Sequence, residues 1–96
     1  MAQIRMTPET MRQRASTTDK QAEAVQGVMN AMDNLLKQLQ SEWEGESVKG
    51  YADRYNKIKP SFRNAKDLLD EIAHNLRATA QIVEETDRNI ASQFRK

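Results

Sequence analysis

Trp43-Glu44-Gly45 lies near the middle of this 96-residue chain, between two long stretches in which apolar residues recur three and four positions apart. That spacing places the apolar side chains of each stretch along one side of an α-helix, because a helix completes a turn in about 3.6 residues. The glycine offers the backbone freedom to reverse direction in a left-handed conformation. The sequence therefore predicts an all-α fold, a helix-turn-helix hairpin of two long antiparallel helices.

The first helix is predicted over about residues 8–42. Thr7-Pro8-Glu9 is typical of a helix start, with threonine as N-cap, proline at the first helical position and an acid near the positive end of the helix dipole. A row of mostly apolar residues then follows at heptad spacing: Met11, Ala15, Thr18, Ala22, Val25, Met29, Met32, Leu36, Leu39 and Trp43. Beside it runs a shorter second row: Ala24, Val28, Ala31 and Leu35. Gly27 lies between the rows, which is easier to understand if another helix approaches closely there.

After a turn at about residues 43–47, the second helix is predicted over about residues 48–94. Its heptad row comprises Val48, Tyr51, Tyr55, Ile58, Phe62, Ala65, Leu69, Ile72, Leu76, Thr79, Val83, Thr86 and Ile90. Flanking apolar residues broaden this row: Ala52, Leu68, Ala73, Ala80, Ala91 and Phe94. Pro60 removes a backbone hydrogen bond, so a kink is expected near it, with the heptad phase continuing. The alternative is a three-helix chain divided there.

The apolar faces are wider than one hairpin needs, and a single domain over residues 1–96 has little interior of its own. Both observations predict self-association through the helix faces. The candidate residues for helix packing and the dimer interface are Val25, Val28, Met29, Met32, Leu35, Leu36, Leu39, Tyr55, Phe62, Leu69, Ile72 and Leu76.

Composition argues against several classes of function. Fifteen basic and fourteen acidic residues leave a net charge near zero, and no nucleic-acid partner is expected because acids flank the basic group Arg54, Lys57, Lys59, Arg63 and Lys66. His74 has no cysteine or second histidine beside it, no carboxylate pair surrounds a cleft and no nucleophile is apparent. We therefore expect no enzymatic activity, no metal and no cofactor.

The sequence shows neither of two common targeting features, a cleavable signal peptide and a membrane-spanning stretch. The N-terminal residues 1–6 lack the apolar core of a cleavable signal peptide, and no stretch is long and apolar enough to span a membrane. General export rules would leave such a chain in the cytoplasm.

At this point the residues resemble a known family. A chain of about a hundred residues, with two heptad helices and a central Trp43-Glu44-Gly45, is similar to the WXG-hundred family of ESAT-like proteins. Met6-Thr7-Pro8-Glu9 also resembles that family's entry to its first helix. The resemblance implies a hairpin that dimerises into an antiparallel four-helix bundle and is secreted through a type VII (ESX) machinery without a cleavable signal peptide, which reverses the cytoplasmic expectation.

The resemblance further implies a composite export signal, made of the Trp-X-Gly turn of one hairpin and a Tyr-X-X-X-Asp/Glu pattern in the C-terminal helix of its partner. Here Val83-Glu84-Glu85-Thr86-Asp87 has valine in place of the tyrosine. A looser form of the signal, an aspartate among spaced apolar residues, is approximated by the candidates Val83, Asp87, Ile90 and Phe94. The departure favours a self-pairing member like those of Gram-positive bacteria outside the actinobacteria.

The leading hypothesis is a secreted interaction protein, a substrate of the secretion system that is a virulence-associated factor or an export escort. Its expected partners are a second copy, or a sister protein of the family, and the FtsK/SpoIIIE-type ATPase of the machinery; membrane contact would occur only through that machinery. Two alternatives stay open: a cytoplasmic coiled-coil adaptor with an accidental Trp-X-Gly, and a membrane-active effector that lays an amphipathic helix on lipid.

Overall fold

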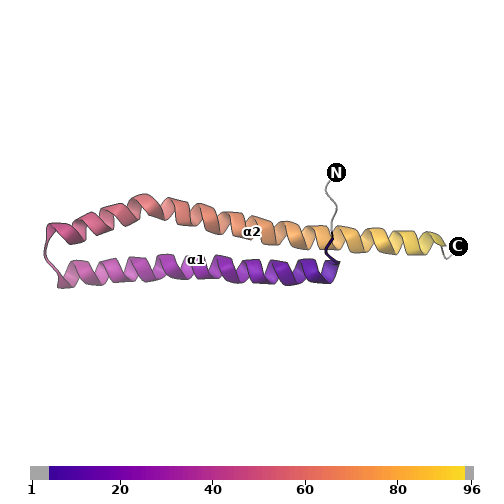
Figure 1. Cartoon of the computed structure of the whole chain (residues 1–96), viewed down its shortest axis with the longest axis horizontal. Coiled ribbons are helices and arrows are strands. Elements are labelled where there is room, and N and C mark those ends of the chain that lie inside the picture. The colour runs from indigo at the N-terminus through magenta and orange to yellow at the C-terminus, as the bar shows by residue number, and fades with distance from the viewer. Residues whose placement is uncertain (1–4, 95–96) are drawn as a thin grey trace. The chain divides into compact units, whose positions relative to one another are not determined.

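The computed structural model of the chain describes residues 5–94; residues 1–4 and 95–96, which the expected domain 1–96 includes, lie outside this range. Two α-helices, α1 (Pro8–Glu42) and α2 (Glu46–Phe94), account for the fold, and residues 5–94 contain no strand (Figure 1). The all-α prediction is therefore confirmed.

The start of α1 has the cap that the sequence predicts. The backbone N–H of Thr10 donates a hydrogen bond to Thr7 Oγ1 at 3.1 Å, and the N–H of Met11 donates to the Thr7 carbonyl at 2.9 Å. Pro8 is the first helical residue, where the missing proline N–H costs no helical hydrogen bond. The first turn of α1 is thus fixed by local sequence alone.

Helix α2 begins at Glu46, earlier than the expected residue 48, and runs without interruption through Pro60. The chain is therefore not divided into a third helix at the proline. Because Pro60 has no N–H, the carbonyl oxygen of Asn56, four residues earlier, lacks its usual helical donor. This missing hydrogen bond is the physical reason to expect a kink near Pro60, which stays a prediction.

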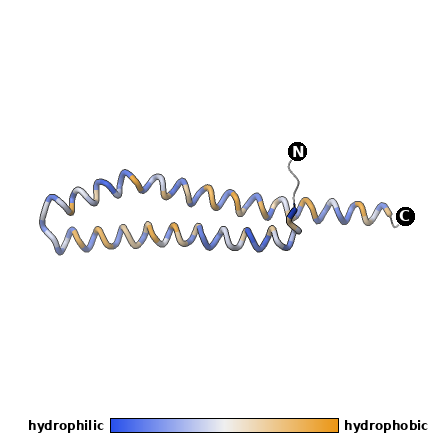
Figure 2. The backbone as a smooth tube through the Cα atoms, in the orientation of Figure 1, coloured by the Kyte–Doolittle hydropathy of each residue, from blue (hydrophilic) through white to orange (hydrophobic). Residues whose placement is uncertain are grey.

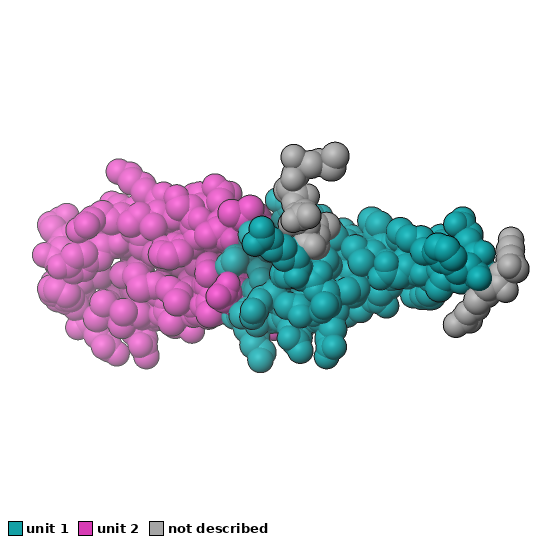
Figure 3. Space-filling model, turned by 45° about the vertical axis from the view of Figure 1, so that its right-hand side comes forward, with its two compact units in different colours: residues 1–20, 69–96 teal, residues 21–68 magenta. Residues whose placement is uncertain are grey.

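The chain forms two compact units, coloured separately in Figure 3. Unit 1 comprises Met1–Lys20 and Leu69–Lys96, the beginning of α1 with the end of α2. Unit 2 comprises Gln21–Leu68, the rest of α1, the turn and the beginning of α2. Each unit has its own buried residues.

In unit 2, the interior is built from one heptad position of each helix. Ala22, Met29 and Leu36 recur every seven residues on α1 and are buried, as are Val48 and Tyr55 on α2. The Tyr55 hydroxyl donates a hydrogen bond to the Met29 carbonyl at 2.9 Å. The recurrence of hydrophobic residues along both helices is visible in Figure 2. The buried residues all belong to the two predicted heptad rows.

In unit 1, Met11 and Ala15 of α1 and Ala73 and Ala80 of α2 are buried. Ala73 and Ala80 flank the heptad row that the sequence predicts for the second helix. Ile72, a member of that row, is 41% exposed. An α-helix drifts by about 20° per heptad relative to a strict seven-residue repeat, so the side of a long helix that is buried passes from one row to the next. Ala73 lies four residues after Leu69, in the repeat that begins with the buried Val48 and Tyr55, so this drift accounts for the step from that repeat to Ala73 and Ala80. Ile72 instead continues the exposed repeat of Tyr51 and Ile58.

Ion pairs join the two helices within unit 1. The Arg77 guanidinium donates to Asp19 Oδ2 at 2.6 Å, and Arg12 pairs with Glu84. The hydrogen bond from Arg77 to Asp19 raises the pKa of the guanidinium. All these side chains are partly exposed, so each pair contributes modestly to stability. They join residues of α1 to residues of α2 that lie far apart in the sequence.

Candidate interaction site

The turn places Trp43 on the surface of unit 2. The Trp43 backbone N–H still donates to the Leu39 carbonyl at 2.8 Å, but α1 ends at Glu42. The indole is 46% exposed and contacts the 48% exposed ring of Tyr51, with ring centroids 6.5 Å apart and planes inclined at 56°. Instead of ending the buried row of α1, Trp43 therefore offers an accessible aromatic surface.

Gly45 does not adopt the backbone conformation that the sequence analysis expects. No glycine or other residue in the range 5–94 has a positive φ, so the left-handed turn is wrong. A Cβ placed on Gly45 would lie 3.7 Å from Trp43 Nε1, an ordinary van der Waals distance. The bend is made by three non-helical residues, 43–45, which reverse the chain without a left-handed residue.

A recess of about 410 Å³ surrounds the turn. It brings the three predicted motif residues Trp43, Glu44 and Gly45 together with Glu46 and Lys49. The Glu46 carboxylate lies 3.9 Å from Lys49 Nζ, and both side chains are largely exposed. The recess therefore combines an indole edge with acidic groups that remain open to solvent.

A second, apolar groove of about 460 Å³ lies elsewhere on unit 2, between α1 and α2. It is lined by Val28, Met32, Leu35, Leu36, Leu39, Tyr51, Arg54, Tyr55, Ile58 and Phe62. Four of these large side chains are roughly half exposed: Val28 (50%), Leu35 (47%), Tyr51 (48%) and Ile58 (48%). Exposed apolar surfaces of this kind are typical of sites that bind other proteins, membranes or ligands.

The predicted packing residues divide into three groups by exposure. Met29, Leu36 and Tyr55 are buried. A half-buried group follows the same two rows: Val25, Met32, Leu39, Phe62, Leu69 and Leu76. Val28, Leu35 and Ile72 are exposed. The first two groups pack within the chain, and the exposed group is free to contact another molecule.

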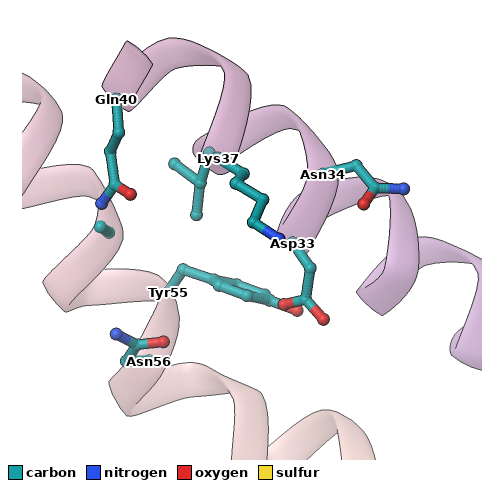
Figure 4. A pocket seen from close by; sticks show the side chains of 8 residues that line it. Asp33, Asn34, Lys37, Gln40, Tyr55 and Asn56 are labelled. Carbon is teal, nitrogen blue, oxygen red and sulfur yellow. The ribbon is translucent and has the colours of Figure 1, made fainter.

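A polar recess of about 260 Å³ is lined partly by Tyr55, which also lines the apolar groove (Figure 4). Lys59 Nζ donates to both carboxylate oxygens of Asp33 at 3.0 Å and lies 5.7 Å from the centre of the Tyr55 ring. The hydrogen bond from Lys59 lowers the pKa of Asp33, whereas burial and the nearby Asp33 carboxylate raise the pKa of Tyr55. This cluster joins α1 to α2 through polar contacts.

The sequence places Arg54 and Lys59 in one basic group flanked by acids, and the structure separates the two side chains. Lys59 is half-buried and paired with Asp33, whereas Arg54 lines the apolar groove. The signal for Arg54 was present in its spacing, three residues after Tyr51 and four before Ile58. The pairing of Lys59 with Asp33 had no local signal, because it depends on how α1 and α2 are aligned.

The candidate export residues lie on α2 in unit 1. Val83 is half-buried, Asp87 is exposed, and Ile90 and Phe94 are 48% and 85% exposed. Their spacing of four, three and four residues places them along one side of the helix. Neighbouring Glu84 is held by Arg12, and Arg88 lies 3.8 Å from its second oxygen. Ile90 and Phe94 are therefore exposed apolar side chains at the C-terminal end of α2, next to a charged segment of the helix.

Within residues 5–94, no group of three or more potential ligands is placed to hold a metal ion. Over the same range, neither helix has an apolar stretch of the length needed to cross a membrane.

Comparison with known proteins gives consistent matches over nearly the whole chain. A family model described as WXG100, proteins of 100 residues with WXG, matches residues 3–88. Protein YukE of Bacillus subtilis is 37% identical over 92 residues, which cover 96% of this chain and 95% of the relative. The type VII secretion system extracellular protein A of Staphylococcus aureus is 23% identical over 98% of this chain and 97% of its own length.

The fold agrees with these matches. The crystal structure of Geobacillus thermodenitrificans EsxA superposes with a TM-score of 0.89 at 34% identity, and covers 95% of this chain and 100% of that protein. The Trp43-Glu44-Gly45 turn, the two helices and the matched range of residues lead to one conclusion: this chain belongs to the WXG100 family.

Proposed function

We propose that this chain is a secreted, non-enzymatic interaction protein of a type VII secretion system, and that it leaves the cell as a folded dimer without a cleavable signal peptide. The observation that carries the proposal is membership of the WXG100 family over residues 3–88. The name of the Staphylococcus aureus relative, which describes an extracellular protein of such a system, supports it. In this role the protein is a virulence-associated factor or an escort for other exported proteins.

The proposed dimer is a pair of identical hairpins that form an antiparallel four-helix bundle. The apolar groove supports this, since Val28, Leu35, Tyr51 and Ile58 remain about half exposed in the single chain. Covering them would remove apolar surface from water at about 25 cal/mol per Å². Sedimentation of the purified chain tests the proposal; a folded monomer at micromolar concentration contradicts it, and a dimer only with a sister protein selects the heterodimer.

The proposed export signal has two parts, the Trp43 turn and the exposed residues Asp87, Ile90 and Phe94 of α2. Their accessibility supports recognition by another protein, with the FtsK/SpoIIIE-type ATPase of the secretion system as the proposed reader. An exposed tryptophan is well suited to this role, because aromatic side chains often dominate the energy of protein contacts. Glu44 beside the indole adds a charged group to the same surface.

Export of point variants tests this signal. Trp43→Ala and Phe94→Ala remove exposed side chains, so we expect normal cellular levels and a loss of the protein from the culture medium. Asn64→Ala, at an exposed position of α2 outside the turn and the C-terminal residues, is the control and should be exported like the natural chain. Wild-type export of both test variants would refute the two-part signal. Loss of export after disruption of the ATPase gene tests the proposed partner.

A further inference from the structure

Arg54 is the only charged residue that lines the apolar groove of unit 2. The remaining lining residues are aliphatic, methionine or aromatic. Within the described range 5–94, Arg54 forms no hydrogen bond, ion pair or ring contact, in contrast to Lys59 five residues later, which is held by Asp33. While the groove is open, water solvates the unpaired guanidinium of Arg54. A partner that covers the groove would remove this water and leave the charge without a counter-ion.

The surroundings of Arg54 continue along α2 as two rows with a seven-residue repeat, whose members are all exposed except the half-buried Thr79. The first row is Tyr51, Ile58, Ala65, Ile72, Thr79 and Thr86, and the second is Arg54, Ser61, Leu68, Asn75, Ile82 and Asn89. Arg54 is the only charged residue in both rows. A partner that packs along these rows would therefore desolvate one cation, which is costly unless the partner supplies a carboxylate.

A second copy of this chain has carboxylates in suitable positions. When two helices pack antiparallel through such rows, a residue of the second row faces a residue of the first row on the other helix. On the partner helix, the residue immediately before the first-row residue that faces Arg54 then lies at the edge of the contact between the two helices. Glu71 precedes Ile72 and Glu85 precedes Thr86, and both glutamates are exposed. In a symmetric dimer the contact occurs twice, so two cations meet two carboxylates.

We propose that Arg54 selects and aligns the second copy in the dimer by pairing with a carboxylate of that copy, Glu71 or Glu85. The inference rests on the proposed self-pairing and adds the residues that set its register. A charge pair at this place rejects partners that offer an apolar or basic residue there, because the guanidinium would be buried without a partner.

The test measures the dissociation constant of the full-length dimer by analytical ultracentrifugation, with folding of each variant checked by circular dichroism. Arg54→Met keeps an apolar side chain of similar length but leaves the carboxylate unpaired, so the dimer should weaken on the order of 30-fold. Arg54→Glu should weaken it more. Arg63→Met is the matched control on the same helix, because Arg63 is exposed and outside the groove; it should change the dissociation constant by less than about 3-fold.

Charge reversal identifies the partner residue. In the double variant R54E/E71K or R54E/E85K, the pair is restored with opposite signs, and one of the two should recover a dissociation constant within about 5-fold of the natural chain. The role of Arg54 is refuted if Arg54→Met dimerises as tightly as the natural chain, or if neither double variant recovers the dissociation constant. Either result would leave the proposed dimer itself unaffected. If the natural chain is monomeric, the proposed dimer itself fails.

Discussion

Replacing Tyr55 with phenylalanine tests how the two helices are joined in unit 2. Tyr55 is 5% exposed, and its hydroxyl donates to the Met29 carbonyl at 2.9 Å. The substitution keeps the ring but removes this donor, and a hydrogen bond of this kind contributes about 1 kcal/mol. For a domain of this size, that loss lowers the melting temperature by about 4–8 °C.

Tyr51 provides a matched control for this experiment. It lies four residues earlier on the same helix and is 48% exposed, and its hydroxyl forms no hydrogen bond with any residue of the range 5–94. Tyr51→Phe should therefore leave stability within about 0.5 kcal/mol of the natural chain. Thermal and urea unfolding should be compared at one fixed chain concentration, because dimerisation adds to the apparent stability.

The pH dependence offers a second check on the surroundings of Tyr55. The pKa of Tyr55 is raised by burial and by the neighbouring Asp33 carboxylate. Because the folded pKa lies above the unfolded value of about 10, the stability from the protonated phenol is fully present below pH 10 and is lost as the pH rises further. If Tyr55→Phe and Tyr51→Phe have equal stability at neutral pH, the inferred link between the helices is wrong.

Three further substitutions test the packing, the open faces and the polar cluster. Ala80→Leu adds volume where the side chain is fully buried and should cost about 1–3 kcal/mol of unfolding free energy, measured by urea denaturation. Gly27→Ala should stabilise the chain by about 1 kcal/mol, because nothing lies within 4 Å of an added Cβ; a weaker dimer in sedimentation would instead show that a second copy approaches there. Asp33→Asn should lose its effect on melting temperature as the pH falls through the lowered pKa of Asp33, since the pair with Lys59 contributes only while the carboxylate is ionised; an effect that does not diminish on acidification would contradict this.

Much of the fold follows from local features of the sequence. Thr7 and Pro8 determine where α1 begins, and the heptad spacing of Met29, Leu36 and Tyr55 determines which sides of the helices are buried in unit 2. Caps and periodicity act over a few residues, so they do not depend on the rest of the structure. The family resemblance also rests on the short Trp43-Glu44-Gly45 segment and its place in the chain.

The features that the sequence did not determine depend on how α1 and α2 are placed within each unit. Burial passes from the repeat of Val48 and Tyr55 to Ala73 and Ala80 because an α-helix drifts relative to a seven-residue repeat, and this drift accumulates over many turns. The pairs Asp33–Lys59 and Asp19–Arg77 join residues 26 and 58 positions apart, a separation at which local pattern carries no information.

The turn has some features that the sequence determines and others that only the tertiary structure determines. The sequence by itself determined that the chain reverses at Trp43-Glu44-Gly45, because the first heptad pattern ends there, the second begins shortly after it, and a glycine lies between them. Only the tertiary structure decided that Gly45 has no positive φ and that Trp43 is 46% exposed against Tyr51. The reason is that exposure is set by the position at which α1 ends and by what packs beside it, and the packing of Trp43 on Tyr51 exists only once both helices are in place.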